Sequence, residues 1–143
     1  MDIWKFYSVG HRLHKYCNPL NEERLETLLH LLRLKPNSTV LDIACGKGEF
    51  LVRLAELYHV IGVGVDISPY FIQEAQTKAK RRVPNAELDF VQLDAKNYKP
   101  PEGLLFDLTC CMGATWIWND YKGTLQALKD MTRPHGTIMV GEP

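Results

Sequence analysis

The fold of this chain is decided by the stretch Val40-Leu41-Asp42-Ile43-Ala44-Cys45-Gly46-Lys47-Gly48-Glu49-Phe50. It begins as a short apolar run, continues as a turn of small residues with two glycines, and ends as the start of an amphipathic segment. This order predicts a buried strand, a tight loop and a helix. The N–H groups at the start of such a helix point outward at the carboxyl end of a parallel sheet, where α/β proteins bind ligands. Taken alone, the pattern fits a plain connector as well as a binding loop.

A second buried strand is predicted over Val60–Val65, and it ends at Asp66. In a doubly wound sheet, a carboxylate at this position lies beside the first glycine loop and can accept hydrogen bonds from both hydroxyls of a ribose. The alternative role for Asp66 is a helix cap or a turn residue. Because Ser68-Pro69 already supplies a cap and a first helical residue, the ribose role is favoured.

The composition narrows the class of protein. The chain has 143 residues, which suits one domain, and its formal net charge is +0, unlike that of a typical nucleic-acid-binding domain. No apolar run reaches the length of a membrane-spanning helix, and the first residues do not resemble a signal peptide. We therefore expect a cytoplasmic protein without nucleic-acid or membrane partners. The 4 cysteines form no C-x-x-C pair, so neither a metal site nor a disulfide framework is expected.

Predicted strands alternate with predicted helices along most of the chain. A helix is expected after Asn21, where leucines recur at helical spacing. The later expected strands and helices are 39–43, 48–58, 60–65, 69–82, 88–93, 106–111, 122–131 and 137–140. This alternation predicts an α/β fold, a Rossmann-like three-layer sandwich around a mostly parallel sheet.

The last predicted strand lies at the end of the sequence and therefore at an edge of the sheet. An exposed apolar edge is a liability, so we expect a cover from residues 1–35, from a second copy of the chain, or from further residues of a longer protein. The last possibility is favoured. We divide the chain into an N-terminal helical segment, 1–35, and a core, 36–143. A homo-oligomer through the exposed edge is a further prediction.

With these residues in place, the chain from Lys35 to Pro143 resembles the class I S-adenosylmethionine-dependent methyltransferases. Five segments resemble the motifs of this family in their order along the chain: 42–48, 63–68, 93–95, 106–111 and 128–138. Ala44 stands where the first motif often has glycine, and Pro134-His135-Gly136 replaces the more usual proline-glycine-glycine. The two strands that follow strand five in the family are absent from this sequence. The resemblance therefore implies that the core is truncated after the fifth strand and that the N-terminal segment is a lid.

The resemblance implies S-adenosylmethionine as the cofactor, bound by the core. It implies that Asp42 organises the glycine loop or meets the methionine ammonium, that Asp66 holds the ribose, and that Asp94 meets the adenine amino group. The alternatives for Asp42 and Asp94 are turn residues at the ends of strands. The implied cofactor-binding residues are Asp42, Ala44, Cys45, Gly46, Gly48, Asp66, Ile67, Asp94, Ala95, Cys111 and Met112.

The resemblance also implies methyl transfer to a small-molecule acceptor that the sequence does not identify. The methyl group is already activated by the cofactor, so the protein mainly orients the reactants and excludes water, and no catalytic residue is identified. The alternative is a cofactor-binding or assembly module without activity of its own. A nicotinamide-dependent oxidoreductase is disfavoured, because its fingerprint would place a third glycine near Leu51 or Val52.

Two groups of side chains outside the motifs are also candidates. His11 and His14 share a helical face in the expected lid, and two histidines without a third ligand make a poor metal site. Trp116 and Trp118 follow the fourth strand and could face the sulfonium, since an aromatic face attracts a cation. Core packing is the favoured role for at least one of these two tryptophans.

Overall fold

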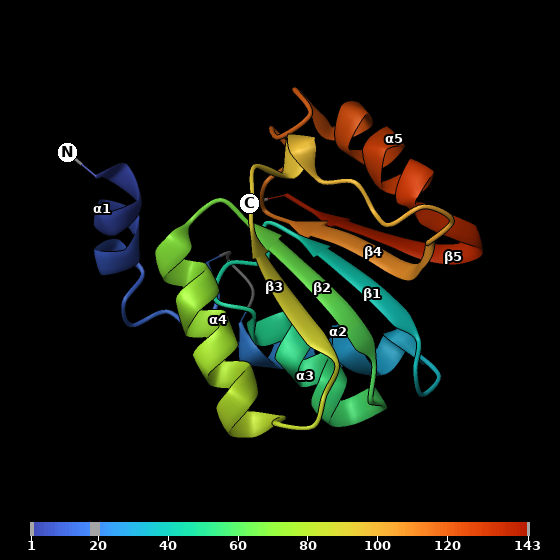
Figure 1. The fold of residues 1–143 in the computed structure, drawn as a ribbon, viewed down its shortest axis with the longest axis horizontal. Coiled ribbons are helices and arrows are strands. Elements are labelled where there is room, and N and C mark those ends of the chain that lie inside the picture. The colour runs from blue at the N-terminus through green and yellow to red at the C-terminus, as the bar shows by residue number, and fades with distance from the viewer. Residues whose placement is uncertain (1, 18–20, 143) are drawn as a thin grey trace.

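The computed structural model describes residues 2–17 and 21–142 of the chain (Figure 1). Its helices are α1 (Ile3–Gly10), α2 (Glu22–Leu32), α3 (Glu49–Tyr58), α4 (Pro69–Arg82), the 3-10 helix η1 (Ala95–Asn97) and α5 (Tyr121–Met131). Its strands are β1 (Thr39–Ile43), β2 (Ile61–Asp66), β3 (Leu88–Gln92), β4 (Phe106–Met112) and β5 (Thr132–Gly141). Asn21 and Ser68 cap α2 and α4, because their side chains accept hydrogen bonds from N–H groups of the first turn, whereas α3 begins at Gly48 without a side-chain cap.

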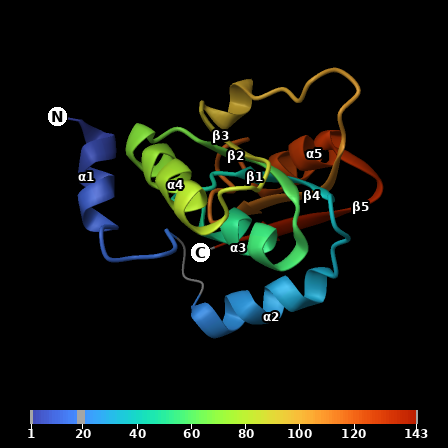
Figure 2. The same ribbon diagram turned by 60° about the horizontal axis from the view of Figure 1, so that its bottom comes forward.

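The five strands form one parallel sheet in the order β3-β2-β1-β4-β5. Helices α2, α3 and α4 cover one face of the sheet, and α5 covers the other face (Figures 1 and 2). This arrangement confirms the predicted three-layer sandwich. Because β1 is central, the glycine loop that follows it lies in the middle of the carboxyl edge, at the point where the strand order reverses. Open α/β sheets bind their ligands at this point.

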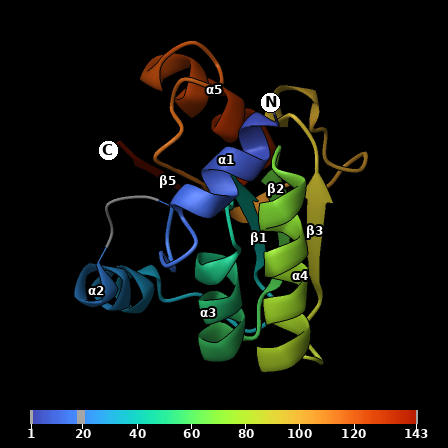
Figure 3. The same cartoon turned by 90° about the vertical axis from the view of Figure 1, so that its left-hand side faces the viewer.

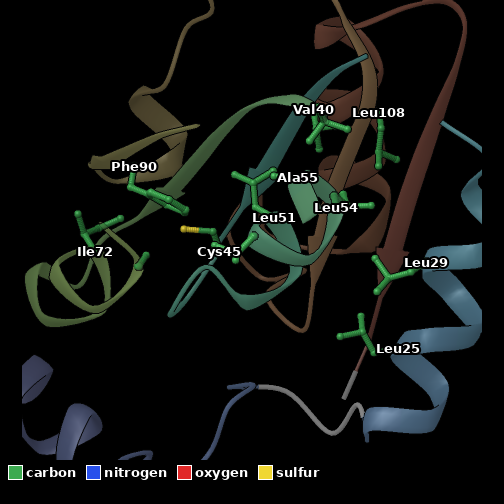
Figure 4. Close-up of a cluster of buried hydrophobic side chains, with 13 residues drawn as sticks. Leu25, Leu29, Val40, Cys45, Leu51, Leu54, Ala55, Ile72, Phe90 and Leu108 are labelled. Carbon is green, nitrogen blue, oxygen red and sulfur yellow. The ribbon is translucent and has the colours of Figure 1, made fainter. Parts of the chain in front are cut away.

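Successive residues of β1 face two separate cores because side chains alternate along a strand. Val40 packs with Leu25, Leu29 and Leu54 on the side of α2 and α3 (Figure 4), whereas Leu41 packs on the side of α5. Helix α2 therefore contributes to the same core as the sheet. The division of the chain at residue 35 stays a prediction.

Strand β5 is longer than the segment 137–140 predicted from the sequence. Thr132 pairs with Phe106 and Thr137 pairs with Leu108, so the register shifts between these two pairs. Residues 133–136, which lie between the helix and the strand predicted from the sequence, are thus a bulge inside β5. Proline cannot donate to the sheet ladder, and bulges are one of the places where a strand tolerates it.

The two edges of the sheet are formed by β3 and β5. Within residues 2–17 and 21–142, β5 pairs with β4 alone. An oligomer through this edge stays a prediction. None of the helices in these two described ranges has the length and apolar character needed to cross a membrane.

Candidate functional site

The loop between β1 and α3 has a backbone that favours small residues. Ala44, Gly46 and Gly48 all have positive φ angles, of 55°, 53° and 68°. The loop is closed by a hydrogen bond of 2.9 Å from Gly48 N to the carbonyl oxygen of Cys45. At Gly48, an added Cβ would lie 2.7 Å from Phe90 Cε1, so this position requires glycine for packing as well as for its φ angle.

Ala44 carries the cost of a left-handed conformation that glycine would not carry. We expect Ala44→Gly to raise the free energy of unfolding by about 1 kcal/mol, because the steric relief exceeds the extra flexibility of glycine in the unfolded chain. Urea denaturation measures this change. Ala127→Gly, in the middle of α5, is the control and should lower the same quantity by about 1 kcal/mol. A loss of stability in both variants would contradict the assignment of strain to Ala44.

Asp66 fastens the glycine loop to the end of β2. Its Oδ2 accepts a hydrogen bond of 2.9 Å from Gly46 N, and its Oδ1 accepts one of 2.8 Å from Ser68 N. Burial raises the pKa of this carboxyl, and the backbone N–H groups partly offset that rise. Ser68 caps α4 by accepting a hydrogen bond from Phe71 N, as the sequence predicted. Ser68 therefore supplies the helix cap, whereas the contact of Asp66 with Ser68 N matches the alternative interpretation of Asp66 as a turn residue. Each oxygen of Asp66 keeps a lone pair for a ligand, and its role toward a ribose stays a prediction.

Asp42 is a buried carboxyl at the carboxyl end of β1, and its side chain is 4% exposed. Cys110 Sγ lies 3.3 Å from its Oδ1 and donates the hydrogen bond found for this side chain among the described residues. Burial raises the pKa of Asp42 to about 7, and the charge of Asp66 adds to the rise. A carboxyl in this state would be stabilised as an anion by any cation that reached it.

Both carboxyls line a cavity of about 480 Å³ at the carboxyl edge of the sheet. Seven of the residues that the resemblance implied for cofactor binding line it: Asp42, Ala44, Cys45, Gly46, Asp66, Ile67 and Met112. Its opposite wall is formed by α1 and by the segment after β4. A cavity of this size, with a few convergent polar groups, is typical of a small-molecule site.

Four of the implied residues do not line this cavity. Gly48 packs against Phe90, and Ala95 and Cys111 belong to the core on the α5 side. Asp94 is exposed, and its Oδ1 accepts a hydrogen bond of 3.0 Å from Lys96 N at the start of η1. This contact matches the alternative interpretation of Asp94 as a turn residue. Its role toward a cofactor stays a prediction, as do the roles of the other three.

The structure adds cavity residues that were not singled out as binding candidates. Ile3 and Trp4 come from α1, and Lys47 and Phe71 come from the glycine loop and from α4. Trp4, Tyr7 and His11 also line the cavity and recur at helical spacing, which was the only sequence signal for a shared face. No sequence signal indicated that the Lys47 side chain lines the cavity, because its placement depends on contacts with residues far away in the chain.

The remaining candidates separate into cavity and core. His11 lines the cavity, and its Nδ1 lies 3.2 Å from the Nδ1 of His14. Trp116 lines the cavity and is 65% exposed, whereas Trp118 packs against the core on the α5 side. Across the described ranges, no cluster of three histidine, cysteine, aspartate or glutamate side chains could hold a metal ion.

The family follows from a comparison with known proteins. A family model described as "Methyltransferase domain" matches residues 40–136, which include most of β1, the glycine loop and both buried carboxyls. The chain belongs to this methyltransferase family. The family predicted from the sequence motifs is thus confirmed.

Solved structures of relatives agree with this assignment. An S-adenosylmethionine-dependent methyltransferase from Geobacter sulfurreducens, in complex with S-adenosyl-L-homocysteine, is 33% identical, with a TM-score of 0.90 over 96% of this chain and 55% of that one. Its counterpart from Thiobacillus denitrificans, with the same ligand, is 32% identical, with a TM-score of 0.89 over 97% of this chain and 56% of that one. These complexes confirm S-adenosylmethionine as the cofactor predicted for the family.

A curated relative, YjhP of Escherichia coli, is 33% identical over 143 residues, which are 100% of this chain and 57% of that protein. The chain thus spans a little more than half the length of the relatives it matches.

Proposed function

We propose that this chain binds S-adenosylmethionine and transfers its methyl group to a small-molecule acceptor. The observation that carries the proposal is the cavity at the carboxyl ends of β1, β2 and β4, where the glycine loop meets Asp42 and Asp66. The bound cofactor would supply a methyl group on a sulfonium, which needs no covalent help from the protein. The work of the protein is then to orient the reactants and to keep water out.

The charges of the cavity suit such a cofactor. Asp42 has a thiol as its hydrogen-bond partner, and its carboxyl is buried, so a cationic ligand group would stabilise its charged form. The α-ammonium of the cofactor is such a group. Asp66 has free lone pairs next to the loop and would accept hydrogen bonds from the ribose hydroxyls.

The outer wall of the cavity supports an acceptor that is small and largely apolar. Apolar and aromatic side chains predominate among the lining residues from the N-terminal segment and from the segment after β4, beside His11 and Lys15: Ile3, Trp4, Tyr7, Trp116 and Ile117. RNA acceptors occur in the names of some more distant relatives, and they are the alternative. Apolar and aromatic walls favour an apolar ligand over a phosphate backbone, which requires clustered cations. The cytoplasmic location expected from the sequence stays a prediction.

Calorimetric titration with S-adenosylhomocysteine tests the binding step. We expect saturable binding by the unmodified chain and binding about 10- to 100-fold weaker in Asp66→Asn, because a charge-assisted acceptor is lost. Asp130→Asn is the control, since Asp130 lies on α5 and bonds to Gln126. Absence of binding by the unmodified chain, or equal affinities in the two variants, would refute the assignment.

Transfer itself is measured with S-adenosylmethionine labelled in its methyl group. Small phenols of increasing apolarity and purified tRNA serve as candidate acceptors. Label on a phenol supports the proposal, and label on tRNA alone refutes the small-molecule acceptor. Binding without transfer to any of them, repeated with a chain of the relatives' full length, would favour a binding module without catalysis.

A further inference from the structure

Lys47 is a buried cation in the middle of the glycine loop, with a side chain that is 5% exposed. Its Nζ donates to the carbonyl oxygens of His11 at 2.8 Å and of Arg12 at 3.5 Å, and it lies 3.1 Å from Glu74 Oε2. A lysine ammonium has three N–H donors, so three partners suffice to saturate it. All three partners lie outside the loop, two of them just after α1 and one on α4.

Helix α1 is otherwise held weakly. It lies beside α4 near the carboxyl edge of the sheet (Figure 3), and none of its residues, Ile3–Gly10, is buried. Phe6 and Val9 are 69% and 66% exposed. At the start of the helix, Tyr70 of α4 donates a hydrogen bond of 2.7 Å to Asp2 Oδ2. Polar contacts thus hold the two ends of a helix with little buried surface, and such a segment has low local stability.

The loop end of the Lys47 contact is fixed by separate interactions. The Lys47 carbonyl oxygen accepts a hydrogen bond of 2.9 Å from Lys78 Nζ, and the neighbouring Gly46 N–H is held by Asp66. The backbone of Lys47 is therefore anchored on the wall of the cavity that carries the carboxyls. The Lys47 ammonium contacts the opposite wall through the carbonyl oxygens of His11 and Arg12, just after α1. A cation is favoured there because it lies at the C-terminus of a helix.

We propose that Lys47 is a positioning residue that holds residues 3–12 closed over the cofactor cavity, and that breaking its contacts opens the cavity for cofactor entry and exit. This inference rests on the proposed function for the identity of the ligand. Opening is accessible because the freed ammonium and the two carbonyl groups exchange their mutual hydrogen bonds for bonds to water. The same ammonium would couple the state of the loop to the position of the N-terminal segment.

Lys47→Met tests the proposal, because it keeps the apolar stem and removes the donors. The tryptophan fluorescence of Trp4 and Trp116, which line the cavity, can report S-adenosylhomocysteine binding in a stopped-flow instrument. We expect the rate constants for association and for dissociation of S-adenosylhomocysteine both to rise about tenfold, because a tenfold change corresponds to the loss of one charged hydrogen bond. Lys80→Met on α4 is the matched control, since Lys80 is exposed and has no ion-pair partner among the described residues.

Trypsin provides a readout that needs no ligand. Cleavage after Arg12 attacks the carbonyl group that Lys47 holds, so we expect this cut to be about tenfold faster in Lys47→Met and unchanged in Lys80→Met. If the unmodified chain fails to bind S-adenosylhomocysteine, the proposed function fails while the cleavage rate still tests the contact. Glu74→Gln removes the charge of one partner of Lys47 and should also make cleavage after Arg12 faster. This variant tests the role of the Lys47 contacts if Lys47→Met does not fold.

Several outcomes would overturn the proposal. One is a folded Lys47→Met variant that trypsin cleaves after Arg12 at the rate of the unmodified chain, and that binds and releases S-adenosylhomocysteine at unchanged rates. Faster dissociation with slower association, accompanied by a lower melting temperature, would point to a damaged loop instead of an opened wall. Wild-type cleavage in Glu74→Gln, where Lys47→Met is unfolded, would also count against it.

Discussion

Replacing Asp42 with asparagine is expected to stabilise the folded chain at alkaline pH and to weaken cofactor binding at the same time. Burial raises the pKa of Asp42 from 3.8 to about 7, so the folded state favours its neutral form. The stability that this group contributes is present at acidic pH and is lost as the pH rises through about 7. Asparagine cannot ionise, and the variant escapes this loss.

The measurement is urea denaturation of both proteins at two pH values. The free energy of unfolding of Asp42→Asn, relative to the unmodified chain, should rise by about 2–3 kcal/mol between about pH 5 and about pH 8. Taking this difference removes the contributions of titrating groups that do not interact with Asp42. A difference that stays constant with pH would show that Asp42 is not a buried carboxyl of this kind.

The functional half of this prediction has the opposite sign. Without the carboxylate, the proposed ammonium of the cofactor loses its counter-ion, and we expect affinity for S-adenosylhomocysteine to fall by about tenfold or more. A variant that is more stable and binds less well would show that this site retains a costly charge for its ligand. Unchanged affinity would remove Asp42 from the proposed ammonium contact and leave Asp66 unaffected.

Replacing Gly48 with alanine is expected to lower the free energy of unfolding by about 3 kcal/mol or more. The new Cβ would lie 2.7 Å from Phe90 Cε1 and 2.8 Å from the Cβ of Ala75, at a residue whose φ is 68°. The cost combines a left-handed alanine with overpacking of the core beneath the loop. Neither neighbour can withdraw easily, because Phe90 and Ala75 are themselves buried.

The control for Gly48→Ala is Gly103→Ala. Gly103 has a similar φ of 78°, but nothing lies within 4 Å of its added Cβ, so only the conformational cost remains. We expect that variant to lose about 1 kcal/mol. Denaturation of the two variants side by side separates packing from backbone strain. Equal losses would show that Gly48 is required for its backbone angle alone.

The sequence was sufficient to predict the first four strands, the helices between them and their order along the chain. Apolar runs such as Val60–Val65 are local signals, and so are the glycines at 46 and 48 and the cap at Ser68, because strand burial, tight turns and capping depend on residues close together in the chain. The same signals placed Asp66 at the end of β2, beside the loop. They failed for β5, since a bulge depends on the partner strand and Pro134 alone indicates a turn.

Only the tertiary structure decided the state of the site. The contact of Cys110 with Asp42 joins residues 68 positions apart, and that of Lys47 with His11 joins residues 36 positions apart. The raised pKa of Asp42 follows from desolvation by the whole assembly of strands and helices, which no local pattern encodes. Local residue order thus determined which segments become strands, loops and helices, while packing determined which of their polar groups are buried and what they contact.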